Sequence, residues 1–157
     1  AFMDSDIGRF NLPESFALLI PGSSLKMAVK RWPAVSYGEI AQRLHQAGIM
    51  PVLLGGKEDE EAIQTIKEIC PEARDLSGQT TLYDIPALAR AASLAIGNDT
   101  GPMHMAALSG CRTIAIFSTK SFPDKAAPRG PNVTLLVEEN LMDLEQHRVW
   151  EAVEARL

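Results

Sequence analysis

The sequence has little of several features that mark specialised classes of protein. It has only two cysteines, Cys70 and Cys111, which stand far apart in apolar stretches. This favours two small buried side chains in a reducing compartment over a disulfide or a metal-binding pair. No apolar run approaches the roughly 20 residues that a membrane-spanning helix needs. Basic residues number 15 against 20 acidic ones, so the net charge of −5 gives no basic footprint for nucleic acid.

The composition that remains is typical of one globular domain. The chain has 157 residues, of which 46% are hydrophobic, enough for a full core. Residues 1–13 lack the charged and apolar regions of a signal peptide, so we expect a cytoplasmic protein. Residues 1–15 are polar, broken by Gly8 and Pro13, and are predicted to be a linker or tail, with the domain in 16–157. We expect the acidic pair Asp4 and Asp6 to be solvated rather than to bind a metal.

Short apolar runs alternate along the chain with amphipathic stretches that have helical spacing. This alternation predicts an α/β fold with a doubly wound, parallel, six-stranded Rossmann-like sheet. Ser36 with Glu39 has the spacing of a capping box, and Asp84 is predicted to cap a helix that ends near Ala92. Ligands of such sheets lie at the carboxyl ends of the strands. The predicted strands are Phe16–Ile20, Met50–Leu54, Ala73–Leu76, Leu94–Ile96, Thr113–Phe117 and Val133–Val137.

The stretch from 93 to 104 predicts a strand, a tight turn and a helix in immediate succession. Pro102 suits the first turn of a helix, and Thr100 can cap it. Unpaired backbone N–H groups and the helix dipole make this position suitable for an anion, and Gly101 lets a phosphate approach the backbone. Taken alone, the stretch also fits an ordinary capping turn, in which Asp99 and Thr100 only cap the helix.

Other polar residues follow the first two predicted strands. Ser23, Ser24 and Lys30 can supply hydroxyls and a positive charge to phosphates, although Lys30 can also be read as a solvated loop residue. Glu58 can accept hydrogen bonds from the two hydroxyls of a ribose, or can simply complement a helix dipole. Asp99 can bind the hydroxyls of a sugar. A nucleoside diphosphate sugar satisfies all of these groups together.

The ordered set of motifs resembles glycosyltransferase family 9, the lipopolysaccharide heptosyltransferases. The resemblance covers roughly residues 16–157 and only the C-terminal half of these two-domain GT-B enzymes, so the N-terminal acceptor domain is expected to be absent from this chain. The matching motifs are Pro-Gly-Ser-Ser (21–24), Lys-Arg-Trp-Pro (30–33), Leu-Gly-Gly-Lys-Glu (54–58), Asp-Leu-Ser-Gly (75–78), Gly-Asn-Asp-Thr-Gly-Pro-Met-His (97–104) and Ala-Pro-Arg-Gly (127–130).

This resemblance implies that the chain is the donor-binding domain of an enzyme that moves a sugar, with heptose the family's usual one, from an ADP-sugar to a lipopolysaccharide core acceptor. His104 lies one turn into the predicted helix, and we expect it to have a structural or orienting role near the site rather than a catalytic one, because Lys30 would already assist departure of the phosphate. The family works without a metal or a cofactor. The implied contacts are the diphosphate with Ser23, Ser24, Lys30, Thr100 and Gly101, the ribose with Glu58, the transferred sugar with Asp99, and the base with Thr80, Thr81 and Leu82.

The resemblance also places the general base on the missing N-terminal domain, so we expect no catalytic residue in this chain and no transfer by it alone. The acceptor is expected to bind through that domain, at the periphery of the inner membrane. A non-catalytic nucleotide-sugar-binding module remains an alternative. An NAD-dependent oxidoreductase is disfavoured, since Pro-Gly-Ser-Ser replaces the Gly-x-Gly-x-x-Gly turn. An epimerase needs catalytic acids that the sequence does not offer. The sugar, base and acceptor stay open.

Overall fold

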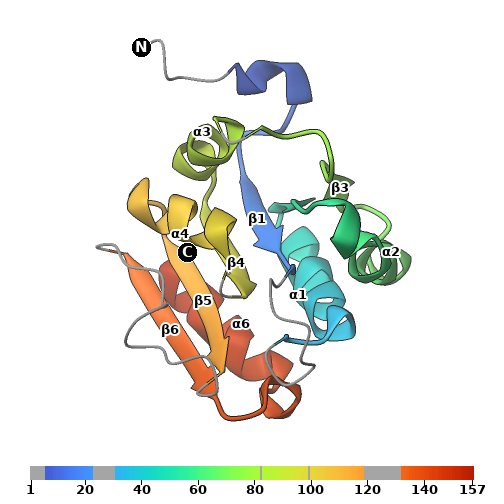
Figure 1. Ribbon diagram of the computed structural model, residues 1–157, viewed down its shortest axis with the longest axis vertical. Helices are drawn as coiled ribbons and strands as arrows, with labels where there is room; N and C mark the ends of the chain where they lie inside the picture. The colour runs from blue at the N-terminus through green and yellow to red at the C-terminus, as the bar shows by residue number, and fades with distance from the viewer. Residues whose placement is uncertain (1–5, 23–30, 82, 99, 119–131) are drawn as a thin grey trace.

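The structure is a computed structural model that describes residues 6–22, 31–81, 83–98, 100–118 and 132–157. Its centre is one six-stranded sheet in which all neighbouring strands run parallel, in the order β3-β2-β1-β4-β5-β6 (Figure 1). The chain moves outward from β1 to β3, returns to pair β4 with β1, and then moves outward on the other side. The strands are β1 (Phe16–Ile20), β2 (Met50–Leu53), β3 (Arg74–Asp75), β4 (Leu94–Asn98), β5 (Thr113–Ser118) and β6 (Val133–Glu138).

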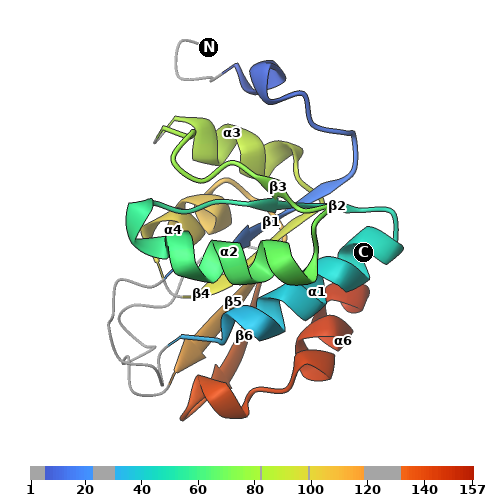
Figure 2. The ribbon, with the colours of Figure 1, turned by 90° about the vertical axis from the view of Figure 1, so that its right-hand side faces the viewer.

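Helices cover both faces of this sheet (Figure 2). One core contains α1 (Ala34–Gln46), α2 (Glu60–Ile69) and α6 (Gln146–Arg156); the other contains α3 (Asp84–Ala91) and α4 (Gly101–Leu108). Successive strand residues alternate between the two, so that Leu19 joins the first core and Leu18 the second. Because both faces are buried, the strands read as continuous apolar runs. Three short 3₁₀ helices complete the described elements: η1 (Ile7–Phe10), η3 (Lys57–Asp59) and η5 (Leu141–Asp143).

The predicted fold class is confirmed, and two helix-capping predictions, at Ser36 and Asp84, are wrong. The six strands lie where the apolar runs predicted them, to within two residues at each end. Cys70 and Cys111 are buried free thiols, as expected. Ser36 does not cap a helix, because α1 begins at Ala34, after Pro33, and has no side-chain cap. Among the described residues, we find no helix with the length and apolar character required to span a membrane.

The segment ahead of β1, predicted to be a tail, packs on the domain over its described part. Phe10 of η1 is buried in the core that contains α3. The Arg74 guanidinium of β3 donates a hydrogen bond of 2.7 Å to the carbonyl of Phe10. Residues 6–10 are therefore held at the amino end of the sheet by both packing and hydrogen bonding.

Gly97 allows three elements to meet at the centre of the sheet. It lies in β4 opposite Ile20 of β1. A Cβ at this position would lie 2.6 Å from the Ile20 carbonyl oxygen and 2.7 Å from the Met103 sulfur of α4. The missing side chain therefore lets α4 pack closely on β4 and sets where the first turn of α4 lies.

We predict that Gly97→Ala lowers the free energy of unfolding by about 1–3 kcal/mol, the usual cost of overpacking, because one of the clashing atoms is backbone. Gly101→Ala is the matched control. A Cβ there meets no atom within 4 Å, so we expect a change within about 0.5 kcal/mol. Urea denaturation of both variants measures the difference, and equal stability for the two would contradict this account of Gly97.

Candidate functional site

A cleft of about 620 Å³ opens at the carboxyl edge of the sheet, where β1 and β4 are neighbours. Chains leaving these two strands turn to opposite faces of the sheet, and the space between them is where ligands of such folds bind. The described residues that line it come from four loops: Ile20, Gly22, Arg31, Leu54, Gly55, Gly56, Glu58, Asp59, Thr80, Ile85, Thr100, Gly101 and Pro102.

One wall of the cleft is the N-terminus of α4. Thr100 is the N-cap residue, with extended backbone dihedrals, and its hydroxyl accepts a hydrogen bond of 3.4 Å from the Met103 N–H. Pro102 stands in the first turn, as predicted. Gly101 has open space on its Cβ side. This wall therefore combines the positive end of a helix dipole with a backbone that a ligand can approach closely.

The opposite wall is acidic and follows β2. The Asp59 carboxylate accepts a hydrogen bond of 2.9 Å from the Gly56 N–H, which fixes the turn between β2 and η3. The same carboxylate packs closely against Gly22, where an added Cβ would come within 2.7 Å of it. Glu58 is exposed and lines the cleft. Its carboxylate is therefore placed to accept hydrogen bonds from a ligand's hydroxyl groups.

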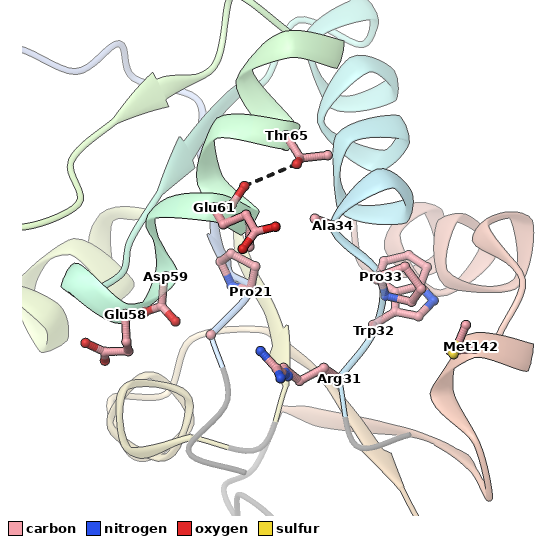
Figure 3. Close-up of a pocket in the computed structure, with 12 residues that line it drawn as sticks. Pro21, Arg31, Trp32, Pro33, Ala34, Glu58, Asp59, Glu61, Thr65 and Met142 are labelled. Carbon is pink, nitrogen blue, oxygen red and sulfur yellow. Dashed lines mark hydrogen bonds between the residues drawn. The ribbon is translucent and has the colours of Figure 1, made fainter. Parts of the chain in front are cut away.

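Arg31 is the only cation among the described residues that line the cleft. It also lines a second cleft of about 390 Å³, which shares Gly22, Glu58 and Asp59 with the first. Figure 3 shows the Arg31 side chain extending toward Pro21, on the side where the two acidic residues lie. Sequence reasoning missed Arg31, because the positive charge of its motif was assigned to Lys30.

The residues after Arg31 are anchored in the core. Trp32 and Tyr37 are buried, and their rings meet edge to face with centroids 4.9 Å apart. The Trp32 indole N–H donates a hydrogen bond of 2.8 Å to the Leu144 carbonyl. Burial raises the pKa of Tyr37 well above its usual range, and hydrogen bonding to Asn98 offsets this only in part. Tyr37 is therefore a neutral hydroxyl donor.

The loop predicted to face the base is held by an ion pair between the buried Asp84 and the partly exposed Arg9. Asp84 is 1% exposed, and its carboxylate lies 2.6 Å from the Arg9 guanidinium and accepts a hydrogen bond of 2.7 Å from the Thr81 N–H. The Asp84 N–H in turn donates to the Thr81 carbonyl. The prediction that Asp84 caps α3 is therefore wrong: Asp84 is the first residue of the helix, the cap position is Tyr83, and the Asp84 carboxylate fixes the backbone next to Thr80 instead.

Some of the predicted site residues lie together in the structure, and others fall outside the residues that it describes. Glu58, Thr80, Thr100 and Gly101 line the one cleft, and Thr81 lies beside it. His104 is half-buried in α4 and is not among the lining residues. Ser23, Ser24, Lys30, Leu82 and Asp99 lie outside the described residues. Within the described ranges, no group of three or more His, Cys, Asp or Glu side chains could hold a metal ion.

Comparison with known proteins gives a consistent set of relatives. A family model described as glycosyltransferase family 9 (heptosyltransferase) matches residues 2–152. Lipopolysaccharide heptosyltransferase 2 of Salmonella typhimurium is 34% identical over 113 residues, which are 69% of this chain and 32% of that protein. Lipooligosaccharide heptosyltransferase 2 of Campylobacter jejuni is 30% identical over 122 residues, which are 75% of this chain and 38% of that protein.

Solved structures of the same kind share the fold. The Escherichia coli ADP-heptose lipopolysaccharide heptosyltransferase II superposes with a TM-score of 0.84 at 28% identity, over 95% of this chain and 49% of that one. A heptosyltransferase from Escherichia coli in complex with ADP gives a TM-score of 0.81 at 21% identity, which supports the fold alone. The chain therefore spans about half the length of these solved proteins and less than two fifths of the curated relatives above.

The ion pair beside the Thr80–Thr81 loop gives a test of how that loop is held. We predict that Arg9→Gln lowers the free energy of unfolding by about 1–3 kcal/mol, because the buried Asp84 carboxylate loses a charged hydrogen-bond partner. Arg148→Gln breaks the more exposed pair with Glu138 and should cost less than about 1 kcal/mol. Urea denaturation of both variants decides the point, and a larger loss for Arg148→Gln would refute it.

Proposed function

We propose that this chain, which belongs to glycosyltransferase family 9 (heptosyltransferase), binds the donor of a sugar transfer. The proposed donor is an ADP-sugar, specifically ADP-heptose. The relative with 28% identity and a TM-score of 0.84 is itself described as an ADP-heptose enzyme. The activity of the whole protein is then transfer of heptose to a lipopolysaccharide core acceptor.

The observation that carries the proposal is the convergence of separate loops on one cleft. Glu58 follows β2, Thr80 follows β3, and Thr100 with Gly101 begins α4, yet all line the same space beside Arg31. Their chemistry is divided in the way that a nucleoside diphosphate requires. A carboxylate that accepts from hydroxyls stands on one side, a helix N-terminus that attracts phosphates stands on the other, and a cation lies near both.

In the reaction that we propose, the bond between the sugar's anomeric carbon and the diphosphate oxygen breaks. Negative charge then grows on the departing ADP while the anomeric carbon becomes positive. The N–H groups at the start of α4, which are fixed before the reaction begins, and the guanidinium of Arg31 would stabilise that charge. Lys30, Ser23 and Ser24 would add contacts to the diphosphate, Glu58 would bind the ribose, and Asp99 the sugar.

The remaining parts of the reaction are assigned outside this chain. An acceptor hydroxyl needs a general base, and we propose that this base and the acceptor site lie in the part of the relatives that the chain does not span. The chain alone would then bind donor without transferring sugar. We also propose that the protein acts in the cytoplasm at the inner face of the membrane, where a lipid-linked acceptor would be reached.

We predict that the chain binds ADP and that Arg31→Ala weakens this binding roughly tenfold to a hundredfold, the value of a hydrogen bond to a charged group. Adenosine binding should change much less, because it lacks the phosphates. Lys30→Ala should behave in the same way as Arg31→Ala if both residues contact the diphosphate. Isothermal titration calorimetry with ADP, ADP-heptose and adenosine measures each affinity.

The control for this experiment is Arg148→Ala, which removes an arginine that is paired with Glu138 and does not line the cleft. It should leave ADP affinity unchanged. The proposal fails if the folded wild-type chain does not bind ADP, or if the loss in Arg31→Ala is equal for ADP and adenosine. A transfer assay on a full-length protein separates an enzyme from a binding module that keeps the same fold.

We further propose that donor binding needs no divalent metal, since a cation and a helix N-terminus already face the phosphate position. The expected result is that ADP affinity is the same, within about twofold, in excess EDTA and in millimolar magnesium, because no bridging ion takes part. Calorimetry in the two buffers provides the comparison. A large gain in affinity with magnesium would overturn this part of the proposal.

A further inference from the structure

The side chain of Asn98 lies at the point where the walls of the cleft meet. It is the last residue of β4 and is fully buried. After it the chain continues through one residue to Thr100, the cap of α4. A polar side chain is costly to bury unless its hydrogen bonds are satisfied, so its partners indicate why the sequence keeps it there.

Four hydrogen bonds join Asn98 to two other parts of the chain. Its side-chain oxygen accepts from the Tyr37 hydroxyl at 2.9 Å and from the Trp32 N–H at 3.3 Å. Its side-chain nitrogen donates to the Pro21 carbonyl at 2.9 Å and to the Gly22 carbonyl at 3.4 Å. We call these five residues the Asn98 network.

The partners fix the orientation of the Asn98 amide. A backbone N–H can only donate and a backbone carbonyl can only accept, so the amide oxygen must face Trp32 and the nitrogen must face Pro21. A carboxamide has both kinds of group, whereas aspartate lacks the donors and leucine lacks both. No apolar or acidic side chain of this size can make the same four bonds.

The network joins the segment that carries Gly22 and Arg31 to the strand that leads to the α4 wall of the cleft. Gly22 lines the cleft directly, and Arg31 immediately precedes the anchored Trp32. Asn98 itself belongs to the strand that leads to Thr100 and Gly101. Asn98 therefore contributes to setting the distance between the cation and the start of α4, through bonds between residues far apart in sequence.

We propose that Asn98 is a positioning residue of the donor site, which holds Gly22 and Arg31 at the distance from the α4 N-terminus that a diphosphate requires. This inference rests on the proposed function, because it names what the two walls bind. Asn98 does not touch the ligand; it acts through the backbone of the segments that do.

The test uses Asn98→Leu, which is close in size and removes all four hydrogen bonds. If the segment around Arg31 then occupies its binding position about a tenth of the time, ADP affinity falls about tenfold while adenosine affinity changes less than about twofold. Tyr37→Phe keeps the ring but removes one donor, and a smaller loss of ADP affinity is expected. This second variant keeps the test decisive if Asn98→Leu does not fold.

A stability control separates positioning from general weakening. Val153→Ala removes buried volume in α6, far from the cleft lining, and should lower thermal stability without changing the ratio of ADP to adenosine affinity. All affinities are measured at a temperature where each variant is folded. Equal losses for ADP and adenosine in Asn98→Leu and in Tyr37→Phe, or no loss in either variant, would overturn the inference.

Hydrogen exchange tests the positioning without any ligand. In Asn98→Leu the Trp32 amide loses its acceptor, so NMR should show faster exchange at Trp32 while amides in α6 keep their protection. Unchanged exchange at Trp32 would refute the positioning role. If the wild-type chain fails to bind ADP, the proposed function falls, and this exchange measurement still decides whether Asn98 holds the segment in place.

Discussion

The pairing of β1 with β4 is the constraint on which the rest of the molecule depends. These two strands lie side by side although the chain forms two further strands between them. From β1 the chain passes to α1 in one core, and from β4 it passes to α4 in the other. The two connections separate at that edge, so a cleft is a geometric result of the strand order. Gly97 lets β1, β4 and the first turn of α4 approach one another closely at this edge.

The division of charge around the cleft follows from which loop arises at which strand. The acidic residues Glu58 and Asp59 belong to the turn after β2, on one side of β1. The start of α4, with its helix dipole, lies on the other side. Arg31 belongs to the connection from β1 and so stands near both. A ligand with hydroxyls at one end and phosphates at the other would find complementary groups in one orientation only.

The fold and much of the cleft could be predicted from the sequence, because strands and helix starts depend on residues that are neighbours in the chain. An apolar run such as Phe16–Ile20 is sufficient to predict a buried strand, and Thr100 with Pro102 to predict the start of a helix. Once the strand order has been inferred, the loops after the strands must meet at the carboxyl edge of the sheet, and they carry Glu58, Thr80, Thr100 and Gly101.

The remaining features depend on contacts between residues that are distant in sequence. Helix α1 begins at Ala34 rather than near Ser36, two residues after Trp32, whose N–H donates a hydrogen bond to Asn98. A capping pattern in the sequence does not indicate this contact. The hydrogen bonds of Asn98 and the ion pair between Arg9 and Asp84 likewise join residues that are 61 to 77 positions apart in the sequence. The sequence signal for Asn98 was a polar residue closing an apolar strand, but it could not identify the partners.

The burial of Tyr37 has a consequence for how the site responds to pH. Its pKa lies well above the usual range of a tyrosine, and the amide of Asn98 does not titrate at all. The direction of every hydrogen bond in the Asn98 network is therefore the same in mildly acidic, neutral and mildly alkaline solution. A network without net charge is also little affected by ionic strength. The part of the cleft's frame that Asn98 holds thus keeps its hydrogen bonds across conditions that change the protonation of a bound diphosphate, and a pH response of donor binding must come from other ionisable groups.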